Sequence, residues 1–144
     1  MNTYLNELFN LEDKNAVVIG GGGHLCGEMA RGFAKAGCRV AVLDLRLEKA
    51  QQTEAELREL GCTEVMSCAI DVAKKEDHEQ ALEAIVASLG KVDILVNGAG
   101  TNGPTPFFDI TLEEWYSILD SQITGTFLGC QVFGRHMVDE GAGS

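Results

Sequence analysis

The residues with the clearest chemical potential are a glycine cluster and a carboxylate that follows it at a set distance. Gly20–Gly23 come directly after the apolar run Ala16–Ile19 and directly before a helix-like pattern. A second apolar run ends at Asp44, roughly 20 residues beyond the glycines, an interval typical of dinucleotide sites. Glycines let the backbone approach a pyrophosphate at a helix N-terminus, and the acid accepts hydrogen bonds from ribose hydroxyls. This stretch therefore predicts a dinucleotide-binding site.

The elements that must position these residues alternate along the chain. Continuous apolar runs, typical of parallel strands covered on both faces, predict strands at residues 16–20, 39–44, 65–70 and 92–97. Apolar positions at helical spacing predict helices at residues 25–36, 46–60 and 75–89. A glycine follows each of these helices, where a left-handed backbone is cheapest: Gly37, Gly61 and Gly90. The pattern predicts an α/β, Rossmann-type doubly wound parallel sheet with the first strand near its centre.

The last part of the chain reads as a loop followed by one long helix. Residues 101–110 contain both prolines and form a loop, and Thr111-Leu-Glu-Glu114 has the pattern of a capping box. From there we expect helix to about Asp139, with a break near Gly125.

Composition and charge exclude several classes of partner. The chain has 144 residues, a formal net charge of −11 and 45% hydrophobic residues, as expected of a soluble globular domain. Nucleic acid or an anionic membrane would require basic patches, so neither is expected as a partner. No apolar run reaches the roughly 20 residues that span a bilayer, and the first residues lack the pattern of a secretory signal. We therefore expect a cytoplasmic protein.

The five cysteines are expected to be reduced, buried thiols. They are odd in number and form no C-x-x-C pair: Cys26, Cys38, Cys62, Cys68 and Cys130. Such a set indicates neither a disulfide framework nor a zinc site, and we expect no bound metal. Cys26 lies near a predicted helix N-terminus, which can lower a thiol pKa, but a packed thiol is favoured.

Three further motifs follow in order along the chain. Ile70–Val72 ends the third strand with an acid, Asp93–Gly100 ends the fourth with Asn-Gly-Ala-Gly, and Gly125–Phe127 lies in the last helix. Together with the glycine loop, these motifs resemble the short-chain dehydrogenase/reductase family, from about Phe9 to the last residue. The run Gly-Gly-Gly-Gly-His-Leu-Cys-Gly is most similar to a subgroup that acts on sugar acids, such as the D-mannonate oxidoreductases.

The resemblance implies a role for each matched residue. The loop glycines would lie against the pyrophosphate, Asp71 with the Val72 backbone would bind adenine, and the motif that begins at Asn97 would lie along the cofactor and steady the fourth strand. The expected cofactor site comprises Gly21, Gly22, Gly23, Leu25, Cys26, Gly27, Asp44, Leu45, Asp71, Val72, Asn97, Gly98, Ala99 and Gly100. Two positions depart from the family pattern, because Gly20 replaces a threonine and Leu25 replaces the middle glycine.

The carboxylate of Asp44 also predicts which dinucleotide is bound. It accepts hydrogen bonds from both adenosine-ribose hydroxyls and repels a 2′-phosphate, so NAD is favoured over NADP. Arg46, two residues on, weakens this preference by offering a positive charge.

Several of these residues also have a purely structural interpretation. Asp71 could cap a helix, and Asn97 could serve only the packing of the fourth strand. His24 is expected to face solvent, and Trp115 and the Phe107-Phe108 pair are expected to pack rather than to contact substrate.

The family's chemistry depends on a serine and a Tyr-x-x-x-Lys motif that come after the fourth strand. Tyr4 and Tyr116 are followed four residues later by Leu8 and Asp120, so neither tyrosine fits the motif. Gln122 stands where the family's long helix usually has an asparagine of the catalytic network. We therefore expect no turnover from this chain alone.

Two hypotheses for the function follow. In the first, residues 1–144 are a single dinucleotide-binding domain, incomplete at its C-terminus after about four strands. This domain would be the NAD-binding portion of an oxidoreductase that transfers a hydride between a nicotinamide cofactor and a small alcohol or ketone. In the second, the chain is a non-catalytic nucleotide-binding or interaction module. A homo-oligomer is expected, through an unpaired apolar edge at Val92–Val96 or through helix 111–139.

Overall fold

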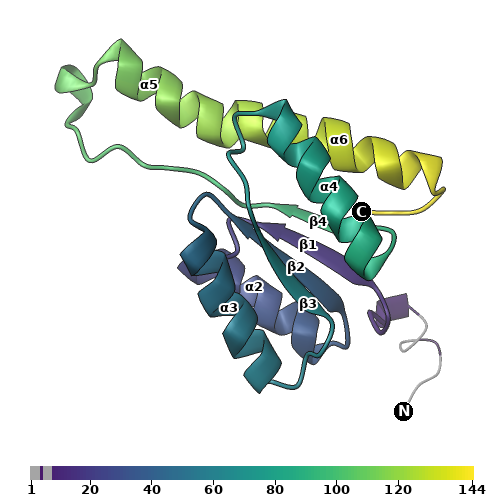
Figure 1. Cartoon of the computed structure of the whole chain (residues 1–144). Coiled ribbons are helices and arrows are strands. Elements are labelled where there is room, and N and C mark those ends of the chain that lie inside the picture. Colours follow the sequence, from purple (N-terminus) through teal and green to yellow (C-terminus); the bar gives the residue numbers. More distant parts are fainter. Residues whose placement is uncertain (1–3, 5–7) are drawn as a thin grey trace.

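The computed structural model of the chain describes Tyr4 and residues 8–144, so most of the segment weighed against a secretory signal lies outside the described residues. Within the described residues, four parallel strands form one sheet in the order β3-β2-β1-β4 (Figure 1). They are β1 (Asn15–Ile19), β2 (Arg39–Asp44), β3 (Val65–Ala69) and β4 (Ile94–Asn97). The predicted Rossmann-type sheet, with the first strand inside it, is confirmed.

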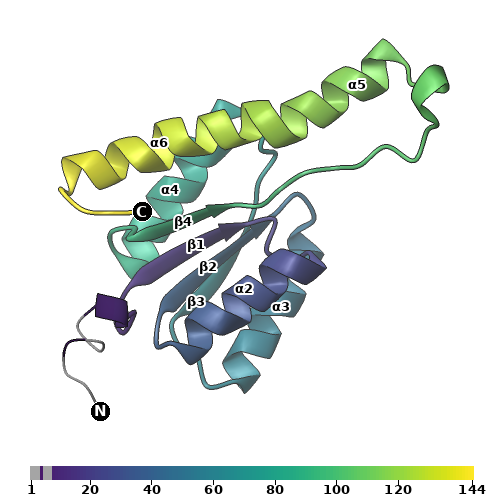
Figure 2. The ribbon, with the colours of Figure 1, turned by 180° about the vertical axis from the view of Figure 1, so that it is seen from behind.

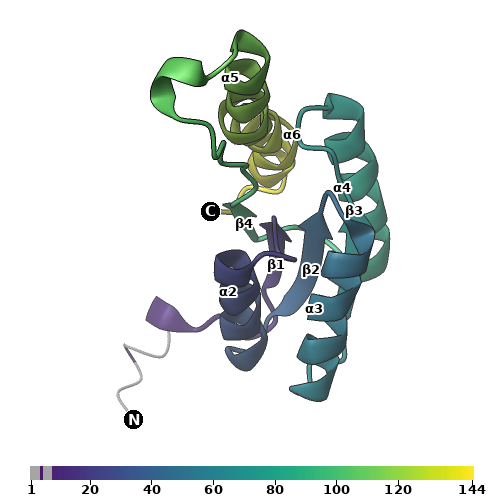
Figure 3. The same ribbon diagram turned by 90° about the vertical axis from the view of Figure 1, so that its left-hand side faces the viewer.

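Helices cover both faces of this sheet (Figures 2 and 3). Helices α2 and α3 pack on one face, and α4 and α6 pack on the other. They are α2 (His24–Lys35), α3 (Leu47–Glu59), α4 (Lys75–Leu89) and α6 (Gly125–Asp139). The predicted doubly wound arrangement is therefore present.

The central strand β1 supplies side chains to both cores. Because successive strand residues point to opposite faces, Val18 packs with α2 and α3, whereas Val17 and Ile19 pack with α4 and α6. All three are buried, and each such side chain contributes about 1.5–3 kcal/mol of hydrophobic free energy. The strand ends at Ile19 because Gly20 adopts a left-handed backbone, with φ of 82°.

The predicted helix ends and the long last helix are observed, with one refinement. Gly37, Gly61 and Gly90 have the expected positive φ angles, of 86°, 93° and 90°. The hydroxyl of Thr111 accepts a hydrogen bond from the Glu114 N–H at 3.2 Å, as the capping box predicts.

The break expected near Gly125 is a π-helical turn. Helix α5 (Leu112–Leu119) continues through η2 (Asp120–Thr124) into α6, so the three form one continuous rod (Figure 2). A 3₁₀ turn, η1 (Phe107–Asp109), precedes them. Neither this rod nor any other helix of the described residues is long and apolar enough to cross a membrane.

The outer edge of β4 is partly paired, which corrects the expectation of an unpaired apolar edge. The Leu95 N–H donates to the Ser144 carbonyl at 2.9 Å, and the Ser144 N–H donates to the Asp93 carbonyl at 3.0 Å. Just before the strand, the Val92 N–H donates to Nε2 of His136 at 3.2 Å. The segment after α6 returns beside β4 in the parallel sense and covers these groups (Figure 1).

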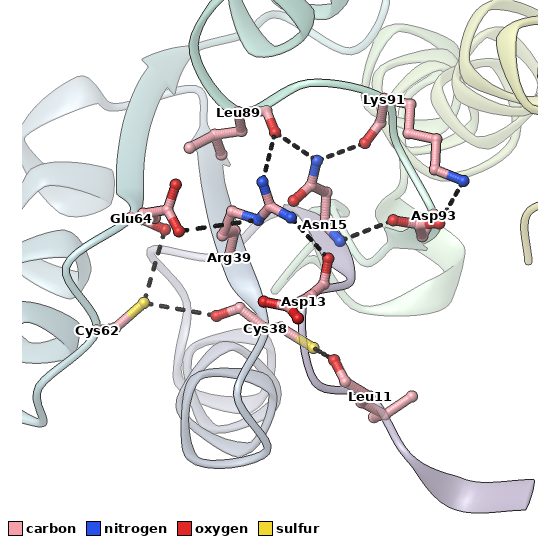
Figure 4. A network of polar contacts seen from close by, with 10 residues as sticks. All are labelled: Leu11, Asp13, Asn15, Cys38, Arg39, Cys62, Glu64, Leu89, Lys91 and Asp93. Atoms are coloured by element: carbon pink, nitrogen blue, oxygen red, sulfur yellow. Dashed lines mark hydrogen bonds and ion pairs between the residues drawn. The ribbon is translucent and has the colours of Figure 1, made fainter. Parts of the chain in front are cut away.

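A polar network joins the amino ends of the strands, at the end opposite the glycine loop (Figure 4). The side-chain amide of Asn15 donates to the carbonyls of Leu89 and Lys91, each at 2.6 Å. The backbone N–H of Asn15 donates to the Asp93 carboxylate at 3.0 Å, and Arg39 donates to the Leu89 carbonyl at 3.4 Å. These bonds hold the start of β1 to the turn between α4 and β4.

Asp93 is the buried charge of this network. Burial by itself would raise the pKa of the Asp93 carboxyl. The N–H of Asn15 and the ammonium groups of Lys91 and Lys14, at 3.3 and 3.6 Å, outweigh burial and lower this pKa. The carboxylate is therefore charged and paired at neutral pH.

We predict that Asp93→Ala lowers the free energy of unfolding at neutral pH by about 1–3 kcal/mol, because Asn15 loses a hydrogen bond to a charged group. Since folding lowers the pKa of Asp93, its contribution is complete above the unfolded pKa of roughly 4 and disappears as the pH falls through the lower folded pKa. Urea unfolding at neutral and acid pH measures the difference. A difference that does not shrink in acid contradicts the assignment, and Asp139→Ala, at an exposed site, is the control.

Candidate dinucleotide-binding site

A cleft of about 1120 Å³ lies at the carboxyl ends of the strands. The loops after β1, β2, β3 and β4 form its floor and one wall, and α5 with the π-helical turn forms another wall. Ligands of open α/β sheets bind at this end, where the strand order reverses between β1 and β4.

The glycine loop packs too closely on its neighbours to hold larger residues. A Cβ built on Gly20 would lie 2.9 Å from the backbone N of Ala99, and one on Gly21 would lie 2.7 Å from Val42. A Cβ on Gly22 would lie 2.9 Å from the Asp44 carboxylate. The loop thus sits directly on the ends of the strands, where its backbone reaches the cleft.

The N-terminus of α2 has the features of an anion-binding site. Gly23 is the N-cap, no side chain caps the helix, and the first turn contains no acidic residue. The first-turn N–H groups and the helix dipole are therefore available to a phosphate. His24 and Leu25 line the cleft, and His24 is exposed as expected. Leu25, which departs from the family pattern, is 68% exposed and stands at the cleft instead of in the core.

Asp44 is fixed beside this loop by two backbone donors. One carboxylate oxygen accepts from the Gly22 N–H at 3.1 Å, and the other accepts from the Arg46 N–H at 3.1 Å. Asp44, Leu45 and Arg46 all line the cleft. Each oxygen keeps a further lone pair for a ligand hydroxyl, so a vicinal diol such as ribose fits this carboxylate.

Asp71 and Val72 line the cleft after β3. The Asp71 carboxylate accepts from the Ala73 N–H at 3.2 Å and pairs with Lys74 at 3.1 Å. The hydrogen bond from Lys74 is the main cause that lowers the pKa of Asp71, so its carboxylate is charged at neutral pH. Asp71 stabilises its own turn and is not the N-cap of α4, since Lys74 holds that position.

The motif after β4 divides between the cleft and the protein interior. Gly98, Ala99 and Gly100 line the cleft. Asn97 does not, because its side chain turns toward α6, where it contacts Cys130 at 3.5 Å and fills the space left by Gly129. This contact fits the role of steadying the end of β4.

Of the remaining predicted site residues, several do not line the cleft: Gly21, Gly22, Gly27 and Gln122. Gly27 packs in α2 near the carbonyl of Gly21. The side chain of Gln122 donates to the Thr101 carbonyl at 2.8 Å, so it holds the loop after β4 against the π-helical turn.

Cys26 is a packed thiol, as favoured from the sequence. It is buried, its thiol lies 3.6 Å from the Gly98 carbonyl, and burial, with a smaller effect of Asp44, raises its pKa. The expectation that all the thiols are buried holds for Cys26 and Cys38, but Cys62 and Cys68 are only partly buried and Cys130 is exposed on α6. All five cysteines are free, and the described residues contain no group of three His, Cys, Asp or Glu side chains suited to a metal ion.

The second wall of the cleft was missed from the sequence. One face of α5 and the π-helical turn contributes a polar set of side chains: Glu113, Tyr116, Ser117, Asp120 and Ser121. Their spacing of i, i+3, i+4, i+7 and i+8 is that of a single helix face, which is the signal that could have found them. The aromatic residues expected to pack are instead exposed, namely Phe107, Phe108 and Trp115.

Comparisons with known proteins identify the family of this fold. The family model described as short chain dehydrogenase matches residues 14–144. The D-threitol dehydrogenase of Mycolicibacterium smegmatis is 35% identical over 137 residues, covering 94% of this chain and 52% of that protein. The 5-keto-D-gluconate 5-reductase of Escherichia coli is 30% identical over 139 residues, covering 96% of this chain and 54% of that protein. The crystal structure of a short-chain type dehydrogenase/reductase from Mycobacterium marinum matches with a TM-score of 0.89 at 31% identity, over 94% of this chain and 54% of that one.

The chain belongs to the short-chain dehydrogenase family, because the family model matches it from Lys14 to its last residue. It spans about half the length of the curated relatives that it matches. The family resemblance inferred from the motifs is confirmed, and the sugar-acid subgroup stays a prediction.

We predict that Gly98→Ala destabilises the fold mainly through the thiol of Cys26, with the Ile19 carbonyl a lesser contact at 3.2 Å. A Cβ on Gly98 would overlap the thiol of Cys26, and overpacking of this kind costs about 1–3 kcal/mol. In a Cys26→Ala background the same substitution should cost clearly less, because the thiol is gone. Urea unfolding of the four proteins in this cycle measures the coupling.

The control for this cycle is Gly134→Ala, where nothing lies within 4 Å of the added Cβ and a helical alanine is favourable. Equal costs of Gly98→Ala in the two backgrounds would show that Cys26 does not set the requirement for glycine.

Proposed function

We propose that this chain is the NAD-binding portion of a short-chain oxidoreductase that transfers a hydride between a nicotinamide cofactor and a small hydroxyl or ketone substrate. The observation that carries the proposal is the Asp44 carboxylate, held at the end of β2 by the Gly22 N–H of the glycine loop. An acid for the ribose and a backbone cradle for the phosphates thus lie side by side in one cleft. A bound nicotinamide dinucleotide supplies the hydride chemistry.

Each part of the cleft receives one task in this proposal. The first-turn N–H groups of α2, beginning at His24, stabilise the pyrophosphate charge. Asp44 orients the adenosine ribose by accepting from its hydroxyls, and Asp71 with the Val72 N–H contacts the adenine. Gly98, Ala99 and Gly100, which follow β4 and line the cleft, lie along the cofactor. The proposal assigns no proton-transfer residue to this chain, so the 144-residue polypeptide alone should not turn over substrate.

We predict that Asp44→Ala weakens NADH binding about tenfold to a hundredfold, because two hydrogen bonds to a charged acceptor are lost. Asp44→Asn, which keeps the shape but removes the charge, should bring the affinity for NADPH close to that for NADH. Titration calorimetry of the wild type and both variants with each nucleotide measures this. Unchanged NADH affinity in Asp44→Ala would refute the proposed ribose contact, and Glu59→Gln, at an exposed carboxylate on α3, is the control.

For the substrate we propose a sugar alcohol or its keto form. A relative named as a D-threitol dehydrogenase supports this class, whereas a relative named as a 5-keto-D-gluconate 5-reductase, whose named compound carries a carboxylate, supports the sugar-acid alternative. The polar wall carries the carboxylates of Glu113 and Asp120 next to hydroxyl side chains, which suits a neutral polyol better than a sugar acid. The sugar acid expected from the sequence, such as mannonate or fructuronate, is the alternative. Calorimetric titration with D-threitol and, separately, with D-mannonate, each in the presence of NAD, distinguishes the two classes. Binding of D-mannonate without binding of D-threitol would favour the sugar acid instead.

We also propose that the chain forms a homo-oligomer through the rod made by α5 and α6. Trp115, Ile123 and Phe127 are 48%, 65% and 58% exposed along this rod. Exposed apolar side chains along this rod support association with a second copy, because this surface is costly in water. The edge of β4 is a weaker candidate, since Ser144 covers part of it.

We predict that Phe127→Glu shifts the protein to a smaller species in size-exclusion chromatography with light scattering, because a charge on this surface opposes its burial. Leu60→Glu, at an exposed leucine beyond α3, should leave the size unchanged. A wild type that is monomeric at high concentration would contradict the proposed oligomer.

A cytoplasmic location is proposed on the basis of the cysteines. All five are free thiols in the structure, which a reducing compartment maintains. Thiol alkylation of the protein in intact cells tests this, and disulfide-bonded protein would contradict it.

A further inference from the structure

Two neighbouring residues in the first part of α4 hold the loop that follows β3. The carboxylate of Asp77 accepts from the Asp71 N–H at 2.9 Å. Nε2 of His78 is hydrogen-bonded to the Val72 carbonyl at 2.9 Å. Because a carbonyl oxygen only accepts hydrogen bonds, Nε2 is the donor and carries the hydrogen. Consecutive helix residues thus hold consecutive loop residues.

His78 is an unusual residue for its position. It is fully buried, and its ring meets Phe133 of α6 edge to face, with centroids 6.3 Å apart. Its Nδ1 has no partner, which is a cost inside a protein. A leucine would fill similar space without this cost, so the distinctive contribution of the imidazole is its hydrogen bond to Val72.

The hydrogen bonds made by Asp77 and His78 leave one acceptor and one donor at the cleft, the Asp71 carboxylate and the Val72 N–H. The side chain of Val72 is pressed against Gly125, where a Cβ would come within 2.8 Å of Val72 Cγ2. With its carbonyl taken by His78 and its side chain against α6, Val72 has an N–H that donates to no group among the described residues. Asp71 presents a charged acceptor next to this free donor, and both residues line the cleft.

We propose that Asp77 and His78 are positioning residues of the adenine subsite: they fix the Asp71–Val72 backbone so that one donor and one acceptor face the base. Adenine carries an amino donor beside a ring-nitrogen acceptor, which is the complementary pattern. Hypoxanthine has a carbonyl in place of the amino group and a ring N–H in place of the ring-nitrogen acceptor. Its acceptor would therefore face the Asp71 carboxylate, and its donor would face the Val72 N–H. This inference rests on the proposed function, because it assumes that the cleft binds the adenine of a dinucleotide.

The test compares the binding of AMP and IMP, which differ only in these groups of the base. We expect the wild type to prefer AMP, and His78→Leu and Asp77→Ala to reduce the AMP-to-IMP ratio of affinities roughly threefold to tenfold, the effect of one misplaced hydrogen bond. His78→Gln keeps a donor and Asp77→Asn keeps an acceptor, so each should restore most of the ratio. Calorimetry gives the affinities, and circular dichroism verifies the fold of each variant.

The AMP-to-IMP ratio of affinities separates a positioning role from a role in general stability, because a merely structural defect weakens the binding of both nucleotides alike. An unchanged ratio in folded His78→Leu overturns the role of His78, and if that variant does not fold, an unchanged ratio in Asp77→Ala overturns the proposal. If the wild type binds neither NADH nor AMP, the proposed function fails, and the inference fails with it. NADH binding with no preference for AMP over IMP overturns the inference alone.

Discussion

The structure depends on glycines that lie closer to neighbouring groups than a Cβ permits. At the carboxyl ends of the strands, Gly20 lies against Ala99, Gly21 lies against Val42, and Gly98 lies against the thiol of Cys26. This contact brings the loops after β1 and β4 together on the central part of the sheet and leaves the N-terminus of α2 open to the cleft. A dinucleotide site needs this approach, because phosphate is bound by backbone N–H groups rather than by long side chains.

The two ends of the sheet use their carboxylates differently. At the amino end, Asp93 is enclosed by Asn15 and two lysines and serves stability. At the carboxyl end, Asp44 and Asp71 are held by hydrogen bonds from backbone N–H groups yet remain at the cleft, where they can still accept from a ligand. The cleft therefore lies at one end of the sheet, and the network of Figure 4 fixes the other end.

Local patterns in the sequence were enough to predict the elements and the contact between the glycine loop and Asp44. Helix α4 was predicted with its observed ends, and the glycine loop and Asp44 lie together at the cleft as expected. Features that depend on distant segments were not predictable. The pairing of Ser144 with β4 and the burial of His78 against Phe133 bring together residues far apart in the chain. The polar face of α5 was readable from its spacing, but without the fold nothing indicated that it faced the cleft.

The most direct test of the central claim is to follow the backbone amide resonances of the chain by NMR during titration with NADH. We expect the amide resonances of His24, Leu25 and Cys26 at the start of α2 to shift together with that of Val72. The amides of Asn15 and Lys91 at the opposite end should stay in place. Shifts confined to that opposite end, or no shifts at saturating nucleotide, would contradict the assignment of this cleft as a dinucleotide-binding site.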